Sequence, residues 1–512
     1  MSWNYQTSKE RIKNHLSSLG TIEIEKLVRD ADLYALLSET TCREIFGAHV
    51  YVDVPNFAQL ATEVEGADYP RVNQAIHLYQ REVSRIVEGS GVFDGIRVHF
   101  QGPKLHALFY RPIDAAGQLA TKAVLLQAVL REFVRNVFNS AYPALADIVI
   151  AGGADIGDAI GTQDGMKGDR ELLFIGDPAN YAARIIGEPG ELRLTARIYD
   201  ELTKEIRQLC SKAVDGNYTL DSFDWSVLQR LLINEGIQWS PETSAERLQE
   251  DKVKFPLKDI SCSDADTTID LDALSITNNK RVKAASLFAD VDGFTRYIAA
   301  ATTVEQKQSA LRVLHAIRKE MAAVVKHDFD GLRIQYQGDR VQAFFHMPKN
   351  DPGAIVAKAI DAGVGLQSSM QHTLKECLPE IGDLQLAVGI DFGLTLVSRL
   401  GTRGQRDRIC VGSAVERAAA CQERCHGSEI GITSPVYILL EEAVQRQFRL
   451  DDQRGLYIAT SLTAEKTERL KKAAAYAGGQ PVFLRSTKSG VTVGNTEGPG
   501  ARQVLPSKSY AD

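Results

Sequence analysis

Two aspartates in the C-terminal part of the sequence have the spacing and surroundings of metal ligands. Asp290 ends a predicted strand in the segment FADVDGFT, and Asp339 follows Gly338 in a predicted hairpin turn. Carboxylates from two different elements, both at strand ends, suit a pair of hard divalent cations whose other ligands are phosphate oxygens. Each residue alone is also compatible with a structural role, Asp290 as a helix cap and Asp339 as a turn residue.

A second group of residues is suited to hold a phosphorylated sugar. The backbone amides of Gly293, Phe294 and Thr295 open a predicted helix, where N–H groups can bind a triphosphate. Asn180 and Arg184 lie four residues apart in another predicted helix and therefore share one face. An amide and a guanidinium presented together can fix a ribose and neutralise charge on a transferring phosphorus. The alternative is a solvent-facing helix with an ordinary arginine.

The elements that position these residues occur twice in the chain. The segment DGIRVHFQGPKLHALF, from Asp94, aligns with DGLRIQYQGDRVQAFF, from Asp330, at an offset of 236 residues (330 − 94). The segments GADIG and GIDFG, and also FIGDPANYAA and CVGSAVERAA, align at the same offset. Two copies are too few for a solenoid, so the sequence predicts a duplicated domain.

Each copy predicts the same succession of elements: a strand, a long helix, two short strands around a QG turn, another helix, and two more strands that lead into a helix. Glycine suits the turn because it tolerates positive φ. The pattern predicts an α+β fold with helices covering one face of a sheet. We expect a helical N-terminal segment at 1–45, domains at 46–205 and 283–445, a linker at 206–282 whose acidic run from Ser263 is solvated, and a C-terminal extension at 446–512, disordered from about 478.

The composition is that of a globular protein. Of 512 residues, 44% are hydrophobic and 24% charged, which excludes global disorder. A net charge of −7 provides no broad basic surface, so we expect no nucleic-acid partner. No apolar run approaches the roughly 18–20 residues of a membrane span, and the polar N-terminus has no signal core. Seven cysteines, an odd number, argue against a disulfide framework, and together these features predict a cytoplasmic protein with no membrane association.

Taken together, the motifs strongly resemble the class III nucleotidyl cyclases, the family of adenylate and guanylate cyclase catalytic domains. Asp290 and Asp339 match the family's two metal aspartates, and Asn180 and Arg184 match its transition-state pair in the pattern G-x-x-x-N-x-x-x-R. The resemblance implies two tandem ferredoxin-like cyclase domains that form an intramolecular pseudo-heterodimer, so a single chain would suffice. It also implies two divalent cations, Mn²⁺ or Mg²⁺, with the backbone carbonyl of Val291 as a further metal ligand.

The two copies depart from the family pattern in complementary ways. In the first copy Asp53 remains, but Pro103 replaces the second metal aspartate. In the second copy Glu416 and Ala420 stand where the transition-state pair is expected. Sites in this family form between two domains that face head to tail, so the resemblance implies one competent and one inactive site. In the inactive site the additional carboxylate of Glu416 would repel a polyphosphate.

The positions that read the base in adenylate and guanylate cyclases carry neither of the usual residue pairs. By the family's spacing these positions are His99 and Leu173, and a leucine cannot discriminate by hydrogen bonding. The second copy has a stretch R-x-x-Y-x-G-D-R, formed by Arg333, Tyr336 and Arg340 around the metal aspartate. A tyrosine can stack on or narrow a pocket, and an arginine or histidine can donate to a pyrimidine carbonyl. The alternative is that these are ordinary hairpin residues.

This stretch is similar to the pyrimidine cyclases of bacterial Pycsar antiphage systems. The resemblance implies that the substrate is UTP or CTP and that the products are the 3′,5′-cyclic nucleotide and diphosphate. The cyclic nucleotide would activate a separate effector that this chain does not contact directly. Two alternatives stay open: an adenylate or guanylate cyclase with atypical base contacts, and a non-catalytic nucleotide-binding module.

Overall fold

The computed structural model describes residues 2–164, 171–402 and 405–465. The N-terminal half contains α1 (Tyr5–Leu19), β1 (Glu23–Lys26), α2 (Leu33–Leu36), β2 (Thr41–Asp53), α3 (Phe57–Glu63), α4 (Tyr69–Glu88), β3 (Ile96–Gln101), β4 (Lys104–Phe109), α5 (Ala116–Glu132), η1 (Phe133–Phe138), α6 (Asn139–Ala141), β5 (Ala151–Asp164), β6 (Glu171–Ile175), α7 (Asp177–Arg184), β7 (Leu192–Leu194), α8 (Ala196–Glu201), α9 (Lys204–Arg207), β8 (Cys210–Lys212) and β9 (Tyr218–Leu220). A connecting region holds α10 (Trp225–Asn234), α11 (Pro241–Lys254) and η2 (Leu257–Asp259).

The C-terminal half follows the same plan. It contains β10 (Cys262–Ser263), β11 (Asn279–Asp292), α12 (Phe294–Ala299), α13 (Val304–Ala323), η3 (Val324–Asp328), β12 (Leu332–Gln337), β13 (Arg340–Phe345), α14 (Pro352–Ser368), η4 (Ser369–Leu374), α15 (Lys375–Cys377), η5 (Pro379–Ile381), β14 (Gln385–Thr402), β15 (Gln405–Val411), α16 (Ser413–Glu423), β16 (Glu429–Ile432), α17 (Ser434–Tyr437), α18 (Glu442–Gln445), β17 (Arg449–Asp451) and β18 (Leu456–Thr460).

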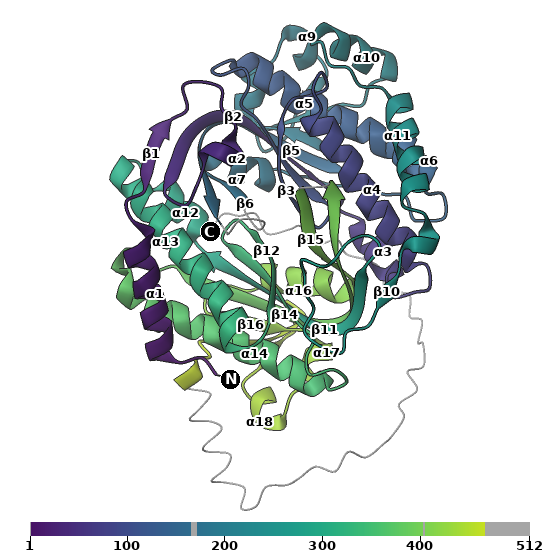
Figure 1. The fold of residues 1–512 in the computed structure, drawn as a ribbon. Helices are drawn as coiled ribbons and strands as arrows, with labels where there is room; N and C mark the ends of the chain where they lie inside the picture. Colours follow the sequence, from purple (N-terminus) through teal and green to yellow (C-terminus); the bar gives the residue numbers. More distant parts are fainter. Residues whose placement is uncertain (1, 165–170, 403–404, 466–512) are drawn as a thin grey trace, which may run out of the picture.

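Each half of the described chain forms one nine-stranded sheet, and the two sheets have the same strand order (Figure 1). The first runs β3-β4-β2-β5-β7-β9-β8, with β1 beside β2 and β6 beside β5. The second runs β12-β13-β11-β14-β16-β18-β17, with β10 beside β11 and β15 beside β14. The hairpin turns also match, because Gly102 and Gly338 both adopt positive φ, 62° and 72°. The predicted α+β fold and its duplication are therefore confirmed.

Alternation along the central strand places different helices on the two faces of each sheet. In β11, Leu287 packs with residues of α13 and α14 in one apolar cluster. Its neighbour Phe288 packs in a second cluster with Val415 and Ala418 of α16. Long helices thus cover one face, and the shorter α16 lies on the opposite face.

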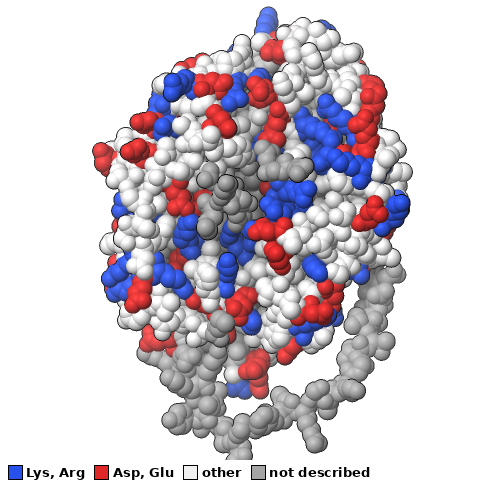
Figure 2. Space-filling view, viewed as in Figure 1, with Lys and Arg blue, Asp and Glu red and all other residues white. Residues whose placement is uncertain are grey.

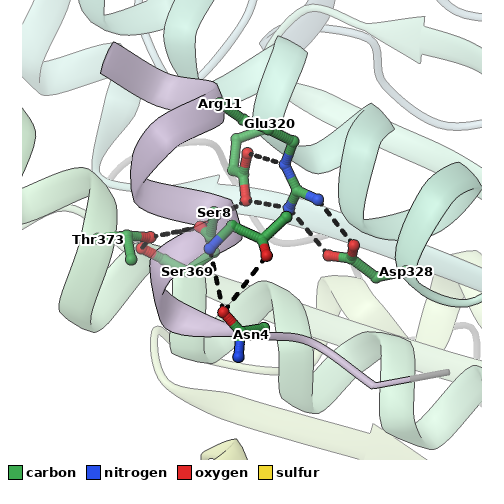
Figure 3. Close-up of polar contacts among 8 residues, drawn as sticks. Asn4, Ser8, Arg11, Glu320, Asp328, Ser369 and Thr373 are labelled. Atoms are coloured by element: carbon green, nitrogen blue, oxygen red, sulfur yellow. Dashed lines mark hydrogen bonds and ion pairs between the residues drawn. The ribbon is translucent and has the colours of Figure 1, made fainter. Parts of the chain in front are cut away.

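The N-terminal helix α1 is docked on the C-terminal half rather than on the sheet that follows it in sequence (Figure 1). Arg11 donates to Asp328 at 2.7 Å and to Glu320 at 2.8 Å, and the hydroxyl of Ser8 donates to Glu320 at 2.7 Å (Figure 3). Ser8 and Glu320 are buried. Because a buried carboxylate needs such partners, these contacts hold α1 on the C-terminal half.

The segment 1–45 is helical only in part, because Glu23–Lys26 forms a strand that pairs in parallel with β2. The expected linker at 206–282 also contains more structure than its composition indicated. Strands β8 and β9 extend the first sheet to Leu220. Leu228 and Leu231 of α10, Leu248 of α11 and Trp239 between these helices lie in its core.

The acidic run from Ser263 is not simply solvated. Its apolar residues Ala265, Ile269 and Leu271 are buried in a cluster on the second sheet. The second sheet likewise continues past 445, to Thr460 at the end of β18. The prediction of disorder from about 478 falls outside the described residues. Among those residues, none of the helices combines the length and the apolar character of a membrane span.

Candidate active site

The two halves face one another head to tail, as two equivalent ion pairs show. Arg97 of β3 lies 2.6 Å from Asp407 of β15, and Arg333 of β12 lies 3.0 Å from Glu171 of β6. Both partners are offset by 236 residues (333 − 97 and 407 − 171). Each half therefore extends a β-hairpin onto the strand of the other, which is the arrangement of a pseudo-two-fold dimer within one chain.

The expected metal aspartates are brought together in the C-terminal half. Asp290 lies at the end of β11, and Asp339 lies in the turn between β12 and β13. Burial raises the pKa of both carboxyls, and the charge of Asp290 raises the pKa of Asp339 further. A buried pair of carboxyls in which the charge of one raises the pKa of the other is a site that a divalent cation would stabilise in its ionised form. The donor set therefore fits the expected cations.

Within the described ranges, no group of three or more His, Cys, Asp or Glu side chains is placed to hold a metal ion. The site thus offers two side-chain ligands, which leaves coordination positions for phosphate oxygens and a backbone carbonyl. Val291, the residue expected to supply that carbonyl, follows Asp290 directly and is buried.

The segment expected to bind phosphate forms a turn and a short helix after these ligands. Gly293 has φ of 84° and precedes α12, a conformation that favours glycine. The first intrahelical bond of α12 runs from the amide of Tyr297 to the carbonyl of Gly293, at 3.0 Å. The amides of Phe294 and Thr295 come before that bond, so they are the donors that a helix start offers to an anion.

Asn180 and Arg184 lie on α7, which packs closely on β5. A Cβ at Gly153 would lie 2.1 Å from the carbonyl oxygen of Ala182, and a Cβ at Gly389 would lie 2.2 Å from the backbone of α16. The repeated glycines therefore allow both helices to lie directly on their strands. Arg184 is exposed, with its guanidinium 5.4 Å from the ring centre of Tyr181.

The start of α7 faces the helix that follows Asp290. A cavity of about 300 Å³ is lined by Gly176, Asp177 and Pro178 from one half and by Ile298 and Ala299 of α12 from the other. In the described part of the chain, no hydrogen bond or ion pair joins Asn180 or Arg184 to the two aspartates. The structure thus places the two groups on opposing elements without direct contact between their side chains.

The reciprocal site is assembled in the same way but carries different chemistry. Asp53, at the end of β2, pairs with Lys104 at 3.0 Å. Burial raises the pKa of Glu416 to about 7, and the neighbouring charges of Asp53 and Glu423 add to the shift. Helix α16 of one half therefore lies near Asp53 of the other.

A second cavity, of about 450 Å³, opens between the halves beside the turn that carries Asp339. Figure 2 shows Lys and Arg side chains around this central hollow. Its lining includes three of the expected base-selecting residues, His99, Leu173 and Tyr336. Burial lowers the pKa of His99 to about 3, so this imidazole is neutral near pH 7.

The other two base-selecting candidates, Arg333 and Arg340, are not among the residues that line this cavity. Arg333 stacks on the ring of Tyr336 at 4.8 Å while it pairs with Glu171. Arg340 turns away, toward α16, where it stacks on Phe288 at 4.4 Å. Its positive charge lowers the pKa of Asp290, so Arg340 is a neighbour of the metal position.

The residues of the central cavity that sequence reasoning missed include Gln163, Glu171 and Arg318. Arg318 is on α13, and it lies 3.1 Å from Asp164 and 2.8 Å from Glu171 of the opposite half. No short motif contains these residues. The one available signal was the presence of an arginine on the apolar face of a predicted helix.

Comparison with known proteins agrees with this architecture. The sequence profile of the adenylate and guanylate cyclase catalytic domain matches residues 277–469. The uridylate cyclase of Pseudomonas aeruginosa is 30% identical over 465 residues, which cover 87% of this chain and 88% of that protein. The uridylate cyclase of a Rhizobium species is 27% identical over 422 residues, 75% of this chain and 77% of its own.

A solved structure is similar over nearly the whole chain. It is a class III adenylyl cyclase-like ATP-binding protein from Pseudomonas aeruginosa, with a TM-score of 0.79 and 26% identity, covering 92% of this chain and 99% of its own. The chain belongs to the class III nucleotidyl cyclases, whose members work with divalent metal ions. It is a nucleotide cyclase, a phosphorus–oxygen lyase.

Proposed function

We propose that this enzyme converts UTP to 3′,5′-cyclic UMP and diphosphate at a single site between its halves. The observation that carries the proposal is that the start of α7, the helix that bears Asn180 and Arg184, faces α12, the helix that follows Asp290 in the other half, across one cavity. The reciprocal combination lacks a second aspartate and carries Glu416. One complete set of residues therefore survives in a head-to-tail interface.

The reaction forms a bond between the ribose 3′-oxygen and the α-phosphorus and breaks the bond from that phosphorus to the bridging oxygen of diphosphate. The 3′-hydroxyl proton leaves to solvent, and diphosphate carries away the electron pair of the broken bond. Asp290 and Asp339 would hold two divalent cations, Mn²⁺ or Mg²⁺, which supply acidity at the hydroxyl and neutralise phosphate charge.

The residues of α7 and α12 complete the site. Arg184 neutralises the charge that develops on the phosphorus, a role in which one arginine contributes about 10³–10⁵ in rate in related chemistry. Asn180 orients the ribose so that the 3′-oxygen faces the phosphorus. The amides of Gly293, Phe294 and Thr295 bind the terminal phosphates.

A pyrimidine base is supported by the lining of the central cavity. Leu173 provides no hydrogen bond, and the usual lysine of adenylate cyclases is replaced by the neutral His99. The stacked Arg333 and Tyr336 narrow the space available to a purine. Two relatives along most of the chain are named uridylate cyclases, so we place UTP before CTP.

The cellular role that we propose is production of a second messenger in antiphage defence. The support is the similarity of the R-x-x-Y-x-G-D-R stretch to the Pycsar pyrimidine cyclases. In this role the enzyme acts in the cytoplasm as a single chain, without nucleic acid or membrane. A separate effector protein, not this chain, binds the cyclic nucleotide.

A second candidate is a protein that binds ATP without cyclising it. It is favoured by the printed description of the structural relative, which is an ATP-binding protein. Purified enzyme with Mn²⁺ should be incubated with each of the four ribonucleoside triphosphates, and the products identified by mass spectrometry. We expect cyclic UMP to dominate and Asp339→Ala to abolish it. A preference for ATP would overturn the pyrimidine assignment, and absence of any cyclic product would favour the non-catalytic candidate.

A further inference from the structure

We propose that Arg318 and Glu171, which form an ion pair, recognise the substrate by hydrogen bonds to the edge of its uracil base. This inference rests on the proposed function, because it names the contact that would select UTP. Both residues line the central cavity beside Gly338, the residue before the metal ligand Asp339. Charge from Arg318 also acts on Asp339, lowering its pKa, so the guanidinium is close to the metal position.

Arg318 is held rigidly and still has a donor to offer. Its side chain is 1% exposed, its Nη2 donates to Glu171 at 2.8 Å, and its guanidinium stacks on Tyr336 at 4.0 Å. The hydroxyl of Tyr336 donates to the backbone carbonyl of Arg318, which fixes the ring. Within the described residues, Nη1 of Arg318 has no hydrogen-bond acceptor. A buried guanidinium N–H without an acceptor costs free energy, and a ligand carbonyl in the cavity would remove that cost.

The carboxylate of Glu171 is positioned by two arginines from the opposite half. One oxygen accepts from Arg318, and the other accepts from Arg333 at 3.0 Å. Each carboxylate oxygen has a second lone pair, so Glu171 can accept a further hydrogen bond from a ligand. Arg318 and Glu171, which both line the cavity, therefore place a guanidinium that only donates beside a carboxylate that only accepts, and neither can exchange its role with the other.

This fixed order of hydrogen-bond donor and acceptor is complementary to uracil and not to cytosine. Uracil presents its 4-carbonyl as an acceptor next to N3–H as a donor. Cytosine presents the 4-amino group as a donor next to N3 as an acceptor, and adenine has the same order at its amino group and N1. A side-chain amide could rotate to serve either base, but a guanidinium–carboxylate pair cannot. Guanine has the same order of acceptor and donor as uracil, at its 6-carbonyl and N1–H. Tyr336 must therefore exclude the second ring of guanine from the cavity.

The ion pair also explains why the pocket would need both halves. Arg318 belongs to the half that carries the metal aspartates, whereas Glu171 belongs to the half that carries Asn180 and Arg184. Neither half alone presents both the donor and the acceptor. The base-reading pair therefore forms across the interface, from the same two halves that supply the complete catalytic set.

The position equivalent to Arg318 in the first copy carries no charge. Before the first hairpin, the amide of Gly95 donates to the carbonyl of Val87 in α4. Before the second, the amide of Gly331 donates to the carbonyl of Val325 in η3, which directly follows α13. These two hydrogen bonds align the long helices at an offset of 238 residues (325 − 87). At that offset the equivalent of Arg318 is Gln80, whose amide donates to the carbonyl of the hairpin glycine at 3.1 Å. The contact of Arg318 with Glu171 therefore has no counterpart at the equivalent place, where Asp407 pairs with Arg97.

The test compares UTP and CTP in wild type and in Glu171→Gln, a change that keeps the shape of the side chain but lets the amide rotate. We expect the ratio of kcat/KM for UTP to that for CTP to fall by about tenfold to a hundredfold. Binding of 3′-deoxy-UTP and 3′-deoxy-CTP, measured by calorimetry, should show the same loss of discrimination without turnover. Arg318→Gln provides a second variant and should weaken UTP binding.

The matched control is Glu205→Gln, which makes the same Glu-to-Gln change in an ion pair with Arg230, at 3.0 Å, whose residues do not line the central cavity. It should leave the UTP-to-CTP ratio unchanged. If Glu171→Gln remained folded and kept the wild-type ratio in both measurements, the inference would be wrong while the proposed function stood. If the wild-type enzyme failed to cyclise UTP at all, the proposed function itself would fail.

Discussion

The two ends of the interface between the halves differ in how a strand-end aspartate is neutralised. At the end that we propose to be inactive, called the inactive end below, Asp53 is paired with Lys104 at 3.0 Å. The equivalent of that lysine at the active end is Arg340 (104 + 236), which lies instead 3.4 Å from Glu423 of α16. Glu423 thus draws the arginine away, and Asp290 keeps a carboxylate that a cation can bind.

The helices that face these aspartates, α7 and α16, also carry side chains of different charge. Helix α7 presents Asn180 and the exposed Arg184, whereas α16 presents Glu416, which lies near Asp53 with its pKa raised to about 7. Ser413 at the start of α16 also donates to Glu65 of the other half, so the inactive end is closed by a direct contact. The comparison teaches that one backbone plan can be kept in both copies while the charged side chains and the contacts between the halves differ from one end to the other.

The largest effect should follow from removing one metal carboxylate. We expect Asp339→Asn to reduce cyclic nucleotide formation by at least about 10³-fold, because the second carboxylate ligand is lost. The matched change at the other end, Asp53→Asn, should leave turnover close to that of wild type. Steady-state kinetics with Mn²⁺ compare the two variants, and equal losses in both would contradict the assignment of a single active end.

Arg184→Ala tests the other half of the same site. We expect a loss of about 10³-fold or more in kcat with a smaller change in KM, because the guanidinium acts on charge that develops during the reaction. The side chain is exposed, so the thermal unfolding midpoint should not change. Near-normal kcat in a folded Arg184→Ala enzyme would show that α7 does not face the reacting phosphorus.

Much of the fold could be predicted from the sequence because the duplication itself is a strong constraint. Two copies with a constant offset fix which strands correspond, and hairpin glycines such as Gly102 mark the turns. The structure of the segment 206–282 was harder to predict, because an acidic run with scattered apolar residues has the composition of a linker. Its burial depends on Ala265 and Ile269 meeting a sheet formed later in the sequence, and no local pattern contains that information.

The candidate site was predictable to the extent that its residues occur in short motifs. Asp290 and Asp339 were expected together, and the structure brings them together. Arg340 was grouped with the base-selecting residues because it follows Asp339 in sequence, yet successive strand residues point to opposite faces. Arg318 and Glu171 lie 147 residues apart and meet only when the halves dock, so no motif could have found them.

Stability should depend on pH through Glu416 at the inactive end. Its folded-state pKa of about 7 lies above the ordinary value of 4.5, so the folded protein favours the neutral acid. Stability is therefore lost as the pH rises from about 4.5 through 7, by at most about 3 kcal/mol. We expect Glu416→Gln to raise the free energy of unfolding at pH 8 and to have little effect at pH 5, measured by urea denaturation.

The control for this pH dependence is Glu442→Gln, because Glu442 is an exposed residue paired with Arg446 on the same short helix. Its effect should be small and the same at both pH values. If Glu416→Gln gave an equal change at pH 5 and pH 8, the carboxyl would not be held near Asp53, and the two ends of the interface would differ less than their residues indicate.

The smallest effect is expected from rebuilding the inactive end. Pro103→Asp with Glu416→Asn and Ala420→Arg restores the four family residues, but Lys104 would still pair with Asp53 and compete with a cation. Adding Lys104→Ala should release the carboxylate, and turnover should then rise by at most about twofold, since two independent sites contribute additively. The decisive measurement is the same enzyme with Asp339→Asn. Cyclic nucleotide formed by that variant must come from the rebuilt end, and its absence would show that the Ser413–Glu65 contact, rather than charge, keeps this end closed.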